Sequence, residues 1–112
     1  MMPWLLVVLL SQPISVSVAA RPPACFSPCD VTLEMRYQRD ESNDQLRVLV
    51  EGPSYSSYSE VALDESSPVV LHRQLRALPP GEYEAVVSLI RRVGDSREVG
   101  RAITRIMVTA TE

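Results

Sequence analysis

The sequence predicts an all-β protein, an antiparallel two-layer sandwich of six to seven strands. Three observations predict it. From residue 30 onward, apolar and polar residues alternate with a period of two, which is the pattern of half-buried strands. Short segments rich in Gly, Pro, Ser or Asp separate these runs. No helical repeat is sustained between them, so the strands are expected to pair as antiparallel neighbours and to cover one another's apolar faces in two layers.

The first half of this region holds four expected strands. Residues 31–38 (VTLEMRYQ) and 45–52 (QLRVLVEG) alternate cleanly and are joined by a short polar turn, which predicts a β-hairpin. A shorter strand is expected within 58–65, near a sheet edge. The run 69–78 (VVLHRQLRAL) is rich in β-branched and aliphatic residues and predicts a fourth strand, in which Arg73 is the one charged residue at an inward position.

The second half predicts the last two strands. Pro79, Pro80 and Gly81 form a tight turn that opens an alternating run through residue 92. A glycine-punctuated turn is expected over 93–100. The run 101–110 (RAITRIMVTA) contains apolar residues at helical spacing, but its branched side chains are stiff and lower helix propensity, so a strand is favoured.

Composition limits the possible classes of protein. A chain of 112 residues forms one domain at most, and a content of 46% hydrophobic but 5% aromatic residues requires an aliphatic core. The net charge is −3 and the pI about 5.2, whereas a general nucleic-acid binder carries a basic surface. We therefore expect no nucleic-acid partner.

The N-terminal segment 1–20 has the layout of a signal peptide. It contains no charged residue, its apolar stretch covers residues 4–10, and Pro13 follows. Val18 and Ala20 occupy the −3 and −1 positions of a cleavage site before Arg21. Export by this route predicts a secreted or periplasmic protein, attached to the membrane only if the segment stays uncleaved.

The segment from Leu78 to Tyr83 (LPPGEY) resembles the leucine-x-proline-glycine-x-tyrosine segment of fibronectin type III and related immunoglobulin-like domains. It is also similar to the transthyretin-like sandwiches of exported bacterial proteins. The resemblance implies an immunoglobulin-like sandwich in which Leu78 and Tyr83 pack at the corner before the penultimate strand and the tyrosine hydroxyl caps nearby backbone. Such domains mostly serve as binding, spacer or accessory modules.

Two features depart from these families. Trp4, the single tryptophan, lies in the expected signal segment, so the core tryptophan of fibronectin and antibody domains is missing. Both cysteines precede the first expected strand, so a disulfide joining two sheets is not expected either.

Cys25 and Cys29 are the only cysteines. In an exported chain a disulfide is the favoured state, here a five-residue ring pinning segment 21–29 in front of the sandwich domain 30–112. The alternative is a thiol-dependent redox or metal-binding protein that uses this pair. Redox motifs of the thioredoxin type have two intervening residues, and structural zinc takes four ligands, whereas His72 is the only histidine in the chain.

Catalytic signals are weak elsewhere, because His72 lies in a strand and no nucleophile elbow is present. We expect neither enzymatic activity nor a cofactor.

Two surface features are candidate binding sites. Tyr55 and Tyr58 stand in a Tyr/Ser loop (SYSSYS) whose composition is typical of binding loops. The last hairpin carries five arginines that could meet an anionic surface or glycan: Arg91, Arg92, Arg97, Arg101 and Arg105. Edge strands, however, carry such charges routinely. The expected function is an exported, non-catalytic module with a protein or glycan partner, or an envelope accessory factor.

Overall fold

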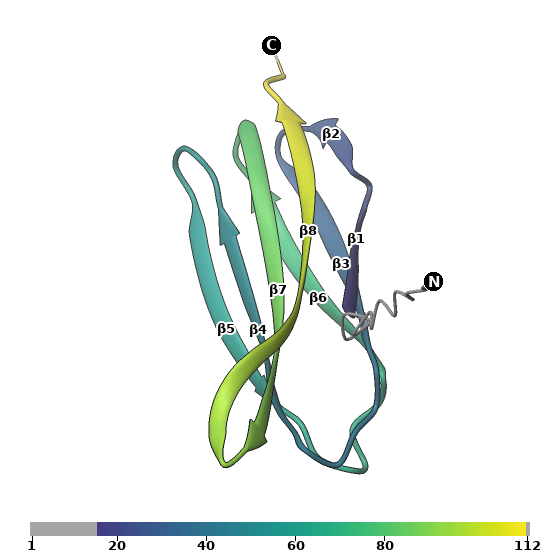
Figure 1. Cartoon of the computed structure of the whole chain (residues 1–112). Helices are drawn as coiled ribbons and strands as arrows, with labels where there is room; N and C mark the ends of the chain where they lie inside the picture. The colour runs from purple at the N-terminus through teal and green to yellow at the C-terminus, as the bar shows by residue number, and fades with distance from the viewer. Residues whose placement is uncertain (1–15, 112) are drawn as a thin grey trace, which may run out of the picture.

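The computed structural model describes residues 16–111 (Figure 1). It contains eight strands and no helix in this range. The strands are β1 (Val16–Arg21), β2 (Ala24–Phe26), β3 (Cys29–Tyr37), β4 (Asn43–Glu51), β5 (Ser56–Ala62), β6 (Val70–Leu78), β7 (Gly81–Val93) and β8 (Asp95–Thr109). None of the described segments forms a helix long and apolar enough to cross a membrane.

The strands form two sheets, one of three strands in the order β1-β3-β6 and one of five in the order β2-β8-β7-β4-β5. All pairs are antiparallel except β2 with β8, which run parallel. This arrangement is an immunoglobulin-like sandwich, and the predicted fold class is confirmed. The strand number is eight because two N-terminal strands add to the six that alternation predicts.

The core forms between the sheets from the inward residues of each alternating run. It is almost entirely aliphatic, with Tyr37 and Tyr83 as its only buried aromatic residues among those described. Arg73 does occupy an inward position, between Leu71 and Leu75 on β6. The largest side chains that are less than 2% exposed are Tyr83, Leu33, Met35, Leu46, Leu75, Leu78, Leu89, Ile106, Val31, Val48, Val50 and Val87.

The corner between β6 and β7 has the contacts that the LPPGEY segment predicts. Leu78 and Tyr83 are buried, and the Tyr83 hydroxyl donates a hydrogen bond to the backbone carbonyl of Pro79. Gly52 lies directly against the Tyr83 ring, where a Cβ atom would collide with Cδ2 and Cε2. The tyrosine therefore fixes the corner and requires a glycine on the neighbouring chain segment.

The N-terminal end differs from the sequence-based expectation. β1 pairs with β3 over six residues and places Val18 and Ala20 against the core. Residues 16–20 of the expected signal segment are thus part of the sandwich, while residues 1–15 lie outside the described range. β2 has only three residues, too few to show alternation, and β1 lies in a segment whose uncharged composition also fits a signal peptide, so the sequence pattern reveals neither strand.

The last hairpin is longer than expected. Its turn lies at Gly94, whose φ of 82° is in the left-handed region that glycine adopts without strain. Residues 95–100, predicted as a turn, continue β8, so β7 and β8 span 13 and 15 residues. The hairpin ends on the side of the sandwich opposite the C-terminus (Figure 1).

Candidate binding face on the five-stranded sheet

An apolar row crosses the outer face of the five-stranded sheet. Leu49 on β4 stands in register with Tyr58 on β5 and Val86 on β7, and Val86 pairs in turn with Ile103 on β8. All four occupy the outward positions of their strands, since their neighbours in sequence are the buried or inward residues. The apolar row is therefore made by four separate strands that only the sheet brings together.

The apolar row belongs to a larger concentration of exposed apolar side chains. In the described residues, the large hydrophobic side chains that remain exposed are Phe26 (69%), Tyr58 (57%), Ile103 (53%) and Met107 (43%). All four lie on this face, because Met107 follows Ile103 along β8 and β2 adds Phe26 beside the end of β8. Exposed apolar side chains gathered on one face are typical of interaction surfaces.

The outer face of the three-stranded sheet is different. Its outward positions carry mainly polar or charged side chains, for example Thr32, Glu34 and Arg36 on β3 and His72, Gln74 and Arg76 on β6. That face is an ordinary solvated sheet surface. The two outer faces therefore provide an internal comparison, one polar and one with an apolar centre.

Paired charges flank the apolar row. On one side, Arg47 Nε lies 3.5 Å from the Glu60 carboxylate, which also accepts a 2.7 Å hydrogen bond from the Tyr58 hydroxyl. That hydrogen bond to Glu60 raises the pKa of Tyr58. Further along, Arg101 donates to Glu98 at 3.0 Å, and this bond lowers the pKa of the Glu98 carboxyl. The charges therefore neutralise one another across the sheet.

The flank on the other side of the apolar row is also mixed in sign. Arg105 on β8 lies 3.9 Å from Glu84 on β7, which pairs with Glu51 on β4. A hollow of about 260 Å³ lies on the Arg47 side, lined by Arg47, Leu49, Tyr58, Val86, Ser88, Glu98 and Arg101. The face thus combines an apolar centre, a shallow hollow and a rim of both charges.

The two tyrosines of the Tyr/Ser loop separate in the structure. Tyr58 lies on β5 and contributes to the apolar row. Tyr55 precedes β5 and packs inward, with its ring at 5.9 Å and 74° to the ring of Tyr83 in an edge-to-face contact. Tyr55 is thus placed as a corner-packing residue beside Tyr83.

The arginines of the last hairpin also separate. Arg91 is buried, donates to Asn43 Oδ1 at 2.8 Å and lies 3.6 Å from Asp40, so it fastens the loop before β4 to the hairpin. Arg92 is exposed and lies 3.5 Å from Asp44. Arg97 is exposed near the hairpin turn, whereas Arg101 and Arg105 lie on the outer face beside the apolar row.

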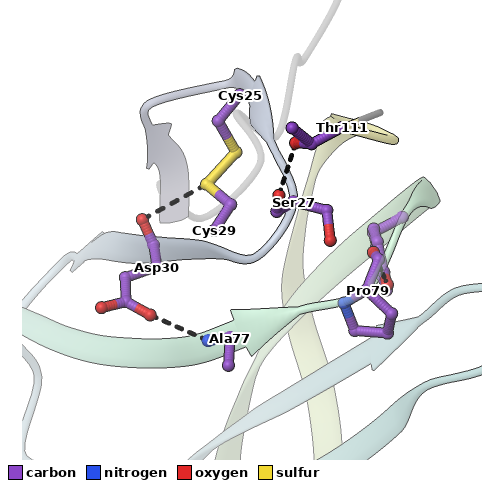
Figure 2. The surroundings of a disulfide bond; sticks show 8 residues. Cys25, Ser27, Cys29, Asp30, Ala77, Pro79 and Thr111 are labelled. Atoms are coloured by element: carbon purple, nitrogen blue, oxygen red, sulfur yellow. Dashed lines mark hydrogen bonds between the residues drawn. A yellow bond between two sulfur atoms is a disulfide. The ribbon is translucent and has the colours of Figure 1, made fainter.

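Cys25 and Cys29 form a disulfide, as predicted. The expectation that both precede the first strand is wrong, because Cys25 lies in β2 and Cys29 in β3, which belong to different sheets. The disulfide therefore joins the two sheets at the corner where the chain passes from one to the other (Figure 2). Asp30 accepts a 2.8 Å hydrogen bond from the Ala77 backbone, and Thr111 donates one of 2.6 Å to the Ser27 carbonyl.

Sequence reasoning missed Leu49, Val86, Ile103 and Met107 as site residues. Each falls on the polar side of an alternating run, where a single apolar residue is common and uninformative. The signal that could have revealed them is the occurrence of apolar residues at outward positions on three strands, β4, β7 and β8, that pair with one another. Strand order and register are needed to convert these outliers into a row.

Comparison with known proteins informs the fold and not the activity. No protein-family model matches the chain, and no curated protein matches its sequence. A superoxide reductase (neelaredoxin) from Ignicoccus hospitalis is structurally similar, with a TM-score of 0.55 and 10% identity over 90% of this chain and 83% of that one. The structure of murine CRIg gives a TM-score of 0.45 and 13% identity over 88% of this chain and 99% of that one.

Within residues 16–111, no group of three or more His, Cys, Asp or Glu side chains is arranged to hold a metal ion.

Proposed function

We propose that this protein is an exported, non-catalytic immunoglobulin-like module that binds a partner protein through the outer face of its five-stranded sheet. The observation that carries the proposal is the concentration of exposed apolar side chains on this face, with the apolar row Tyr58–Leu49–Val86–Ile103 at its centre. Protein interfaces typically combine an apolar centre rich in aromatic side chains with a polar rim.

The charge distribution favours a protein over an anionic glycan or a charged surface. Such ligands bind to clustered positive charge with no compensating carboxylates. Here Arg47, Arg101 and Arg105 each have a carboxylate within 4.0 Å. A partner with an apolar ridge can cover the row while the paired charges stay at the rim and remain hydrated.

The disulfide supports the export part of the proposal and disfavours a dithiol enzyme. Disulfides persist in secreted and periplasmic proteins. Cys25 and Cys29 lie in two β-strands, β2 and β3, whereas the reactive cysteine of a thioredoxin-type motif stands at the N-terminus of a helix, which lowers its pKa. The sulfur pair is placed to join the sheets.

Affinity capture from the extracytoplasmic fraction of cells that naturally make the protein tests the proposal. Ile103→Glu puts a charge in the apolar row, and Thr32→Glu is the matched control on the polar outer face of the three-stranded sheet. We expect the wild type and the control to recover the same partner and Ile103→Glu to lose it, because a hot-spot substitution costs about 2 kcal/mol or more, or roughly thirtyfold in affinity. Thermal unfolding confirms that both variants are folded. Equal recovery by Ile103→Glu and the wild type contradicts the proposal.

A further inference from the structure

A second cleft lies between the sheets, on the side where β5 and β6 are the outermost strands. Neither strand has a second strand neighbour in the part of the chain that the structure describes. The cleft has a volume of about 380 Å³ and is lined by both sheets: Met35, Val48, Val61, Leu71, His72, Arg73 and Gln74. We call it the seam cleft.

The floor of the seam cleft is the core itself. Met35 and Val48 are 1% exposed, and Val61 and Leu71 are partly buried residues packed against the same core. The volume falls within the range of about 300–1,000 Å³ that is usual for small-molecule pockets, which are mainly apolar with a few polar groups. The seam cleft has this composition.

Arg73 is the charged group in the seam cleft. Its Nη2 donates a 3.2 Å hydrogen bond to Ser57 Oγ on β5, across the opening between the sheets. Its Nε is buried and has no hydrogen-bond partner among the described residues. No carboxylate of the described residues lies within 4.0 Å of its guanidinium. A half-buried cation next to apolar side chains, without a counter-charge, is unfavourable unless an anion joins it.

A second unpaired donor lies on the same side. Ser59 on β5 stands in register with Val48, and its hydroxyl oxygen is buried without a hydrogen-bond partner in residues 16–111. Buried polar atoms in native proteins are nearly always hydrogen-bonded. The described residues contain three buried side-chain polar atoms without a partner, Arg47 Nε, Ser59 Oγ and Arg73 Nε, and Arg73 is the one of these residues that lines the seam cleft, where its free donor points to a missing acceptor.

We propose that the seam cleft binds a small aliphatic carboxylate. The alkyl chain would cover Met35, Val48, Val61 and Leu71, and the carboxylate would accept charge-assisted hydrogen bonds from the Arg73 guanidinium, whose planar fork matches it. This site is separate from the outer-face binding site of the proposed function, and either can fail without the other.

Titration of the full chain with octanoate, below the concentration at which it forms micelles, tests this proposal. Methyl NMR signals of Val61 and Leu71 report the site. We expect saturable shifts with octanoate. Acetate should bind at least about tenfold more weakly because it lacks the alkyl chain that covers the apolar floor. 1-Octanol should also bind at least about tenfold more weakly because it lacks the charge, and a hydrogen bond to a charged group contributes roughly this much.

Variants assign the charge to Arg73. Arg73→Met keeps the length of the side chain and is expected to weaken octanoate binding about tenfold or more. Arg73→Lys keeps the charge and retains part of the affinity. Arg76→Met, at the exposed outward position on the same strand, is the matched control and is expected to bind as the wild type does.

Three results would overturn the proposal: no saturable shift with the wild type, octanol binding as tightly as octanoate, or Arg73→Met binding octanoate like the wild type. The physical alternative is that Arg73 only guards two open strand edges, since inward charges on edge strands oppose strand addition. In that case Arg73→Met self-associates and the wild type shows no octanoate binding.

Discussion

Replacing Tyr83 by Phe tests the corner that holds β6, β7 and the loop before β5 together. The substitution keeps the ring against Gly52 and Tyr55 and removes only the hydroxyl that donates to the Pro79 carbonyl. A hydrogen bond of this kind contributes about 1 kcal/mol net, and a buried unpaired acceptor costs about 1–3 kcal/mol. Because Pro79 is only half-buried, its carbonyl regains some hydration, and we expect a loss of about 1.5 kcal/mol in the free energy of unfolding.

Urea and thermal unfolding measure this loss, which corresponds to a decrease of about 5–10 °C in Tm for a domain of this size. Tyr55→Phe is the matched control, because the Tyr55 hydroxyl makes no hydrogen bond within the described residues while its ring makes the edge-to-face contact. We expect Tyr55→Phe to cost less than about 0.5 kcal/mol. Equal effects of the two substitutions, or a loss below about 0.5 kcal/mol for Tyr83→Phe, would refute the reasoning.

The same variant has a pH signature. Burial raises the pKa of Tyr83, with a smaller contribution from Tyr55. The folded chain therefore holds its phenolic proton to higher pH than the unfolded chain does. The stability that the protonated Tyr83 phenol contributes is fully present below the ordinary tyrosine pKa of 10.0. It is lost as the pH rises through the higher pKa that Tyr83 has in the folded chain. Tyr83→Phe should lose less stability than the wild type does between neutral pH and about pH 11.

Three further predictions concern the ends and the surface of the sandwich. A chain that starts at Arg21 lacks most of β1, so it should unfold at lower temperature than one that starts at Val16, and an equal Tm for the two would show that β1 adds nothing. Reducing the Cys25–Cys29 disulfide should lower the free energy of unfolding by about 2 kcal/mol, the chain-entropy value for a five-residue ring. Urea unfolding with and without reductant measures this difference, and an unchanged free energy of unfolding would contradict the prediction. The hydrogen bond from Arg101 lowers the pKa of Glu98, so the stability that the Glu98 carboxylate contributes is present at neutral pH and is lost as the pH falls below about 4.5. The urea midpoint of Glu98→Gln should therefore fall less on acidification than that of the wild type, and an equal fall would contradict this.

Alternation predicts five of the six main strands within a few residues and the C-terminal part of β8, because each alternating face is decided by burial in the core. Leu78 and Tyr83 are placed at the right corner because their roles follow from a compact local segment. β1 escapes prediction because residues 16–20 are uncharged and follow the apolar stretch 4–10 and Pro13, and this layout also fits a signal segment. Their place in the sheet depends on pairing with β3, which local sequence does not specify.

The binding face is predictable only in part. Tyr58, Arg101 and Arg105 are candidates from composition, and the structure places them on one face with Ile103. Arg91, which looks equivalent in the sequence, turns inward because Asn43 and Asp40 accept its charge. Which arginine is structural and which is at the surface depends on contacts between residues about fifty positions apart, and these exist only after the strands have paired.

Site-specific photo-crosslinking in cells that naturally make the protein tests the central claim most directly. A benzophenone side chain at position 103 lies in the apolar row, and the same group at position 36 lies on the polar outer face of the three-stranded sheet. We predict that irradiation yields a discrete adduct with one partner protein from position 103 and none from position 36. Adducts with the same partner from both positions, or from position 36 alone, or from neither, would contradict the assignment of the five-stranded outer face as the binding surface.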